Sequence, residues 1–228
     1  MRCIEVPEGE ESLGQNITQY ANTQNEVSSQ DFAFLDSEQH RLVRELGVLD
    51  FEYILRSAEV PQSVDPSRII DVRDAAVALA CASASVGHSV LAKREVSRLF
   101  SDTAVYKALF NPNTDPLRLS RAVEVMRIVD QALDQMETEV EGVAAGIAVH
   151  GRRTLAHCVL RRIGDSRLSD PEADLAGDYA AVPDELAQYV DKITAVFPDN
   201  AYPGNVFKNQ SRVSSLLTEA GLLTSAAT

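Results

Sequence analysis

An arginine and a histidine lie five positions apart in the segment that begins at His150, and their side chains suit phosphate chemistry. The segment reads His-Gly-Arg-Arg-Thr-Leu-Ala-His, so four residues separate Arg152 from His157. A guanidinium can orient and neutralise a phosphate, and an imidazole can transfer protons near neutral pH. RNA cleavage by the RNA's own 2′-hydroxyl requires these two tasks. Arg152 and His157 are therefore the candidate catalytic residues of this sequence.

The same segment also has the pattern of an ordinary amphipathic helix. Leu155, Val159 and Ile163 recur at helical spacing, which predicts that they pack inward while the neighbouring arginines face solvent. On this interpretation Arg152 and His157 have no catalytic role. The residues alone leave both interpretations open.

Four arginines in and after this segment form the one local basic cluster of the sequence: Arg152, Arg153, Arg161 and Arg162. The whole chain has a formal net charge of −13, which opposes non-specific attraction to nucleic acid or to anionic lipid. Any anionic partner must therefore be held locally. We expect this cluster to contact RNA or an acidic protein surface.

A second candidate binding group consists of three amide side chains near the N-terminus, Asn22, Gln24 and Asn25. They follow a predicted helix, where asparagine tolerates left-handed backbone geometry and can satisfy free carbonyl groups. The amides therefore either cap the helix or face a ligand or a partner segment. The sequence does not distinguish these roles.

Metal, cofactor and membrane chemistry have no support in the sequence. The cysteines Cys3, Cys81 and Cys158 lie far apart, and no two histidines have the four-residue helical spacing of a metal pair. Neither a phosphate-binding glycine loop nor a nucleophile elbow occurs, so we expect no cofactor. No stretch approaches the roughly 18 to 20 apolar residues of a membrane span, and no secretory leader is evident. A cytoplasmic location without membrane contact is the expectation.

Helical periodicity dominates the chain after residue 66 and predicts a bundle. The predicted helices cover residues 69–83, 89–100, 104–110, 115–136, 143–163, 184–197 and 205–220. The helix 115–136 has proline at its first position and a long apolar stripe, so we expect it to be central. The acidic stretch 165–200 is expected to form an exposed loop and a solvated helix face.

The first sixty residues have mixed character. Strands are predicted at 2–6 and 51–55, with helices at 13–21 and 37–47 between them. The segment 61–66 contains two prolines and little to bury, so it is the expected linker. The prediction is a mainly α protein, with a small α/β segment over 1–60 followed by a helical bundle over 65–228.

The run Asn-Ile-Thr-Gln-Tyr-Ala-Asn-Thr-Gln-Asn over 16–25, with Asp31-Phe32 and the predicted helix from Ser37 after it, resembles the signature region of the abortive infection phage resistance (AIPR) family. The strand before this run and the aromatic strand at Phe51-Glu-Tyr53 match the family's order. The resemblance identifies the chain as a C-terminal portion of such a protein. It implies a role in stopping phage propagation and an upstream family core, but supplies no catalytic residues.

The spacing of Arg152 and His157 is in turn similar to the Arg-x(4)-His motif of HEPN ribonucleases, although Arg153 replaces the polar Asn or Asp that often follows that arginine. Two hypotheses result. The first is a non-catalytic helical interaction domain of a phage-defence protein, which binds the upstream AIPR core or another defence protein. The alternative is a metal-independent endoribonuclease that acts through Arg152 and His157 across a symmetric homodimer.

Overall fold

The computed structural model describes residues 35–55 and 64–223 of the chain. Two short parallel strands and twelve α-helices form this part. Their bounds are α2 (Ser37–Val48), β1 (Glu52–Ile54), β2 (Ile69–Asp71), α3 (Val72–Ala82), α4 (Val86–Arg94), α5 (Arg98–Ser101), α6 (Thr103–Leu109), α7 (Pro116–Glu137), α8 (Gly142–His150), α9 (Arg152–Ile163), α10 (Asp165–Ser169), α11 (Ala176–Ala195), α12 (Pro203–Val206) and α13 (Gln210–Glu219). A single 3₁₀ turn, Pro66–Arg68, precedes β2. The predicted mainly α fold class is confirmed.

Helix α7 is the central element, as its apolar stripe predicts. Asp115 caps its first turn by accepting a hydrogen bond from the Leu117 amide, and Pro116 follows where no backbone donor is needed. The helix packs against α2, α3, α8, α9, α10 and α11. Leu119, Val129 and Leu133 are fully buried along this stripe. Helix α7 is therefore the element around which the bundle assembles.

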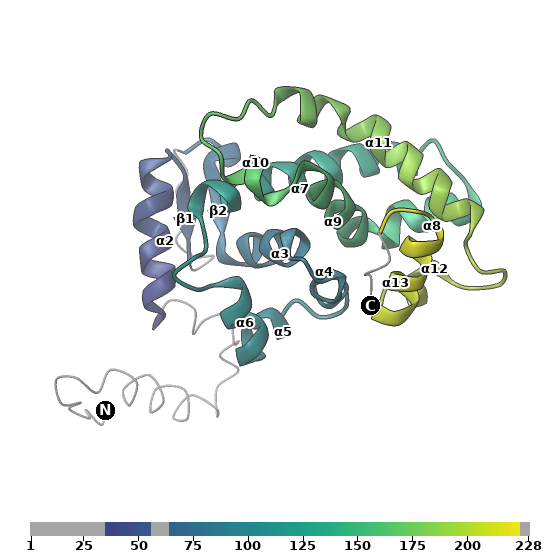
Figure 1. Ribbon diagram of the computed structural model, residues 1–228, viewed down its shortest axis with the longest axis horizontal. Coiled ribbons are helices and arrows are strands. Elements are labelled where there is room, and N and C mark those ends of the chain that lie inside the picture. The colour runs from purple at the N-terminus through teal and green to yellow at the C-terminus, as the bar shows by residue number, and fades with distance from the viewer. Residues whose placement is uncertain (1–34, 56–63, 224–228) are drawn as a thin grey trace.

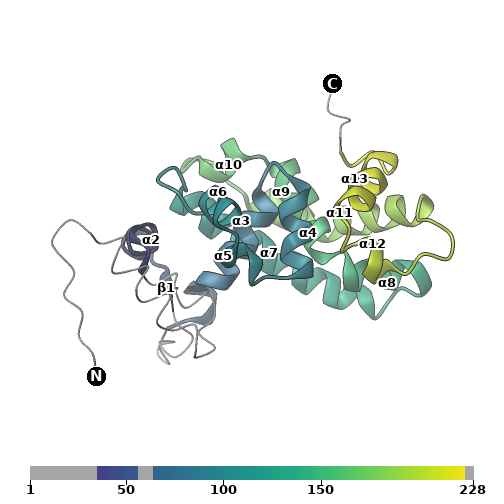
Figure 2. The ribbon, with the colours of Figure 1, turned by 90° about the horizontal axis from the view of Figure 1, so that it is seen from below.

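The small sheet and α2 lie at one end of the molecule, whereas α8, α12 and α13 lie at the other (Figures 1 and 2). Strands β1 and β2 pair in parallel, with Tyr53 opposite Ile70. Helix α2 packs on β1 and also reaches α7. Tyr53 and Ile70 belong to the same hydrophobic core as the bundle. These contacts connect the two sides of the predicted linker, and the division into units 1–60 and 65–228 stays a prediction.

Residues 69–71 form a strand, so the prediction that a helix begins at residue 69 was wrong. Parallel pairing with β1 holds these residues extended, and Arg127 of α7 donates hydrogen bonds to the carbonyls of Ser67 and Ile69. Helix α3 then begins at Val72, where the Asp71 carboxylate accepts a hydrogen bond of 2.7 Å from the Asp74 amide. Tertiary contacts from α7 thus override the local helical pattern.

The predicted helices 89–100 and 143–163 are each two helices. The first divides into α4 and α5 near Glu95, whose backbone leaves helical geometry. The second divides into α8 and α9 at Gly151. A Cβ atom at Gly151 would lie 2.9 Å from the Phe207 ring, so glycine allows that ring to pack against the break.

The acidic stretch 165–200 is more ordered than predicted. Helix α11 begins at Ala176 rather than near residue 184, and it continues through Pro183. Side-chain contacts anchor its first turns. The Tyr179 hydroxyl donates to Glu124 of α7 at 3.0 Å, and Asp178 accepts hydrogen bonds from Arg162 and Arg167. In Figure 1, α11 lies along one side of α7 and α9.

Candidate functional site

Helix α9 carries both predicted catalytic residues and all four predicted basic residues, and its neighbours decide what each can do. The helix begins after Gly151 and packs against α3, α4, α7 and α11. From Thr154 to Leu160 every residue is buried. Helix α9 is therefore a core helix whose polar side chains are exposed mainly at its two ends.

His157 lies in the core, with none of its surface exposed to solvent. Its Nδ1 atom is 2.8 Å from the carbonyl oxygen of Cys81, in the last turn of α3. A carbonyl only accepts, so Nδ1 carries the proton and satisfies one of the carbonyls that a helix end leaves free. Nε2 is buried without a hydrogen-bond partner in the described residues. Burial lowers the pKa of His157, which keeps the ring neutral.

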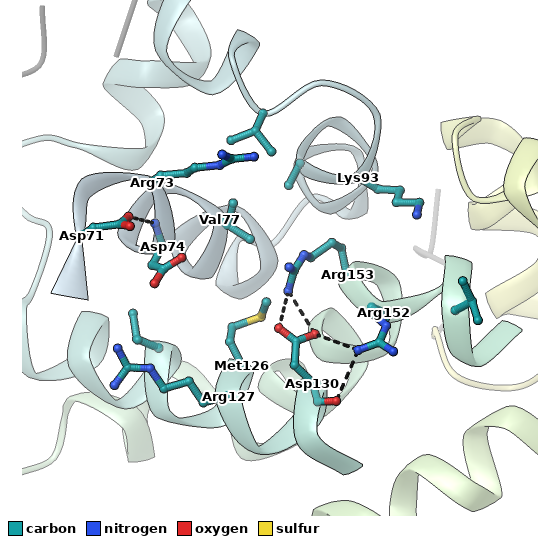
Figure 3. Close-up of a pocket in the computed structure, with 14 residues that line it drawn as sticks. Asp71, Arg73, Asp74, Val77, Lys93, Met126, Arg127, Asp130, Arg152 and Arg153 are labelled. Atoms are coloured by element: carbon teal, nitrogen blue, oxygen red, sulfur yellow. Dashed lines mark hydrogen bonds and ion pairs between the residues drawn. The ribbon is translucent and has the colours of Figure 1, made fainter. Parts of the chain in front are cut away.

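Arg152 and Arg153 point toward α7 and pair with its carboxylates. Arg152 contacts Asp134 at 2.6 Å and Glu137 at 3.2 Å, and it also donates to the backbone carbonyl of Asp130. Arg153 binds the Asp130 carboxylate at 3.0 Å. Figure 3 shows both guanidinium groups directed at Asp130. These ion pairs join the first turn of α9 to the second half of α7.

The structure does not bring Arg152 and His157 together. Five positions on a helix with 3.6 residues per turn correspond to a rotation of about 140°, so the two side chains leave α9 in different directions. Arg152 lines a cleft against α7, whereas His157 is buried against α3. The two tasks of RNA cleavage therefore have no shared location within one chain.

Arg161 and Arg162 lie at the other end of α9, so the predicted basic cluster is divided. Arg162 forms ion pairs with Asp178 and, at 2.8 Å, with Glu185, both of which belong to α11. Arg161 contacts Asp165 at 3.9 Å. The predicted contact of four arginines with RNA or an acidic protein surface stays a prediction, and the structure engages each of them with a carboxylate of this chain. Asn22, Gln24 and Asn25 lie outside the described residues.

A cleft of about 520 Å³ opens between α3, α4, α7 and the start of α9. Among its residues, sequence reasoning singled out only Arg152 and Arg153. The others include Asp71, Arg73 and Asp74 at the start of α3, Lys93 in α4, and Arg127 and Asp130 in α7. The residues that line the cleft come from positions 71 to 153, and no short sequence pattern relates them. Only the packing of four helices brings them to one place.

Burial and the neighbouring Asp71 raise the pKa of Asp74 in this cleft, and three arginines oppose that effect. In the part of the chain that the structure describes, no three His, Cys, Asp or Glu side chains are arranged to hold a metal ion.

Comparison with known proteins assigns the family. A family model described as "AIPR protein" matches residues 1–159, which is more than half of the chain. The chain belongs to the AIPR family. No curated protein and no solved structure matches it.

The AIPR match includes the residues that line the cleft but not the helices that follow α9. Every residue that lines the cleft falls between Asp71 and Arg153, inside the matched range. The match ends within α9, so α10 to α13 lie beyond it. AIPR membership itself suggests a role in abortive-infection defence against phage. Within residues 35–55 and 64–223, no helix has the length and apolar character needed to cross a membrane.

Proposed function

We propose that this AIPR chain is a non-catalytic helical interaction domain of a bacterial abortive-infection phage-defence protein. Family membership supports the defence role. The interaction role is supported by the contacts of the two candidate catalytic residues, Arg152 and His157. Both bind other helices of the same bundle. The partner that we propose is an upstream AIPR core or another defence protein.

The observation that carries this proposal is the burial of His157. A general base must come within about 3 Å of the proton that it removes, directly or through one water. His157 has no exposed surface, and its one proton is donated to the Cys81 carbonyl. Arg152 is engaged by Asp134 and Glu137. Both residues therefore have structural roles that explain their presence without chemistry on RNA.

The outer face of α2 is the surface that we propose for partner contact. His40, Arg44 and Val48 follow one another at four-residue intervals, which places them in one stripe on the helix. All three are exposed, and Val48 keeps 83% of its surface accessible. Figures 1 and 2 show α2 at the edge of the molecule, so a partner can reach this stripe without disturbing the bundle.

A plaque assay with the complete natural protein tests the interaction role. Arg44→Glu is compared with Lys192→Glu, which makes the same charge change on an exposed position of α11. We expect Arg44→Glu to abolish defence while Lys192→Glu retains it, with unchanged helical circular dichroism for both. Full defence by a folded Arg44→Glu protein would reject α2 as the contact surface.

A second assay tests the absence of catalysis. Purified wild-type chain at high concentration is incubated with labelled RNA, beside an Arg152→Gln variant. We expect no cleavage above the buffer control from either protein. RNA cleavage by the wild type that disappears in a folded Arg152→Gln variant would overturn the proposal in favour of the endoribonuclease alternative.

A further inference from the structure

The cleft, whose lining residues all lie in the matched region, combines an apolar wall with several charged groups. Valine, alanine and methionine side chains from α3, α4, α7, α8 and the connection between α4 and α5 form the wall, and its apolar residues are Val77, Ala92, Val96, Val123, Met126 and Val149. The volume of about 520 Å³ lies within the range of roughly 300–1,000 Å³ that is usual for small-molecule sites. The size and the mixed lining both suit a ligand with one apolar part and one charged part.

Cationic side chains outnumber carboxylates among the residues that line the cleft, although the whole protein is acidic. Five cationic side chains line it, against the three carboxylates Asp71, Asp74 and Asp130, and Asp134 and Glu137 pair with Arg152 beside the lining. The five cations are Arg73, Lys93, Arg127, Arg152 and Arg153. The complete chain, in contrast, has a formal net charge of −13. Cationic groups without an ion pair in a concave, partly apolar site attract anions there.

Two of these cations have no hydrogen-bond or ion-pair partner in the part of the chain that the structure describes, although Arg73 is near enough to Asp74 to lower the pKa of that carboxyl. Lys93 and Arg73 form no hydrogen bond or ion pair with the described residues, whereas Arg127 holds the carbonyls before β2. Burial, followed by Lys208, Arg153 and Arg152, lowers the pKa of Lys93. The Lys93 ammonium is thus partly buried among other cations. In Figure 3 it extends from α4 toward the side of the cleft where Arg152 and Arg153 lie.

Arg152 and Arg153 already hold an anion in the cleft, namely the Asp130 carboxylate. Arg153 contacts it at 3.0 Å and Arg152 at 3.9 Å. A guanidinium binds carboxylate and phosphate oxygens in the same geometry, so a pair of arginines that accepts the one also accepts the other. Asp130 keeps about a third of its side chain exposed, so a ligand can approach this pair from solvent.

We propose that the cleft binds a nucleoside di- or triphosphate. Its phosphates lie among Lys93, Arg152 and Arg153, with Arg73 as a further cation, and the base lies against the valine and methionine wall. A small ligand fits better than a nucleic-acid strand. A strand that left the cleft would meet the acidic surface of a protein with net charge −13, whereas a nucleotide keeps all its negative charge inside.

Isothermal titration calorimetry of the complete chain tests this site with ATP and GTP as probes. Inorganic pyrophosphate and a single-stranded RNA oligonucleotide are titrated in parallel. We expect one nucleotide to bind per chain, more tightly than pyrophosphate, and with an affinity that falls as salt is added. Binding that is as strong for pyrophosphate as for ATP would reject the base-binding wall. RNA that binds more tightly than ATP would reject the small-molecule assignment.

Variants locate the binding. Loss of one charge-assisted contact costs about tenfold or more in affinity, so Lys93→Gln and Arg73→Gln are each expected to weaken ATP binding by that factor. Lys192→Gln on the exposed face of α11 is the matched control and should bind as the wild type does. Asp130→Asn removes the carboxylate that competes for the arginines and should tighten binding severalfold. Because Arg73 is exposed, its variant remains informative if Lys93→Gln does not fold. Affinity unchanged in both cation variants, or no saturable binding at millimolar ATP, would overturn the proposal.

Discussion

The hydroxyl of Tyr106 donates a hydrogen bond of 2.7 Å to Oδ2 of Asp36, the residue that caps α2. Seventy positions separate these residues in the sequence. Gln39 donates to the same hydroxyl at 3.0 Å and accepts a hydrogen bond of 2.7 Å from Tyr53. This network joins α2, β1 and α6 through side chains alone. It therefore connects α2 and β1 to α6 of the bundle, in addition to the pairing of β1 with β2.

Tyr106→Phe should destabilise the protein by about 1–3 kcal/mol, because it leaves Asp36 and Gln39 without their shared partner in a partly buried place. Urea denaturation followed by circular dichroism measures the loss. Tyr202→Phe is the control. Its hydroxyl contacts His150 at 2.9 Å, but the residue is 60% exposed, so a change within about 0.5 kcal/mol is expected. Equal effects of the two variants would show that the network contributes no stability.

His157 should make the stability of the protein fall with pH at pH values above those at which carboxylates titrate. Burial lowers its folded-state pKa below the usual value near 6.5, so the unfolded chain binds the proton more readily. The stability that neutral His157 provides is complete above about pH 6.5 and is lost as pH falls through the folded pKa. The free energy of unfolding should fall by up to about 1.4 kcal/mol per pH unit in that window.

His157→Gln isolates this effect, because glutamine can still donate to the Cys81 carbonyl but does not titrate. Urea denaturation between pH 7 and pH 5 should give a flatter pH dependence for His157→Gln than for the wild type. His40→Gln, at an exposed position of α2, should keep the wild-type slope. A wild-type slope in His157→Gln would mean that other groups cause the acid sensitivity.

The buried thiols should produce a second loss of stability on the alkaline side. Burial raises the pKa of both Cys81 and Cys158 to about 12, whereas an unfolded cysteine titrates near about 8.5. Their contribution is complete below about pH 8.5 and is lost as pH rises toward 12, because the unfolded chain releases the protons first. Each thiol should lower the free energy of unfolding by up to about 1.4 kcal/mol per pH unit.

Urea denaturation at pH 8, 9 and 10 measures this slope, and replacement of Cys81 and Cys158 by alanine should flatten it. Labelling with a thiol reagent in a Cys3→Ala background provides an independent check. We expect both buried thiols to react only at the rate of unfolding. Rapid labelling of the folded protein at pH 8 would contradict their burial.

Local signals made some elements predictable and others not. Asp115, Pro116 and a complete apolar stripe predict the helix at residues 115–136, because each of these signals acts within the helix itself. The break at Gly151 depends on Phe207, more than fifty positions away, and no window around Gly151 contains that contact. The start of α11 depends likewise on arginines of α9 and α10.

The candidate site likewise has some residues that local sequence signals predict and others that only distant contacts bring together. Arg152 is predictable as a candidate because it forms a short motif with His157, and Arg153 because it follows Arg152 in the basic cluster. The carboxylate of Asp130, which pairs with both, belongs to α7 and has no place in that motif. No motif around Lys93 in the sequence indicates a binding role for this residue. The cationic lining of the cleft is assembled only when four helices converge, so the sequence could predict two of its arginines but not the cleft.

Arg162 and Arg161 both belong to the predicted basic cluster, but only Arg162 pairs with α11. Arg162 pairs with Asp178 and Glu185, whose side chains are 16% and 21% exposed, and so ties α9 to α11. Burial acts to raise the pKa of Asp178, but its contacts with Arg167 and Arg162 outweigh this and lower it. Among the described residues, removal of Arg162 leaves Glu185 without an ion pair and Asp178 with Arg167 alone. Arg162→Gln should therefore cost about 1–2 kcal/mol of unfolding free energy.

Arg161→Gln is the matched control, because Arg161 is 43% exposed and its ion pair with Asp165 is 3.9 Å long. We expect a change within about 0.5 kcal/mol from it. Urea denaturation at 50 mM and 500 mM salt should show that salt weakens the wild type more than Arg162→Gln, because screening acts on the pairs that the variant has already lost. If the two variants had equal stability at low salt, α11 would be held on α9 by its apolar face alone.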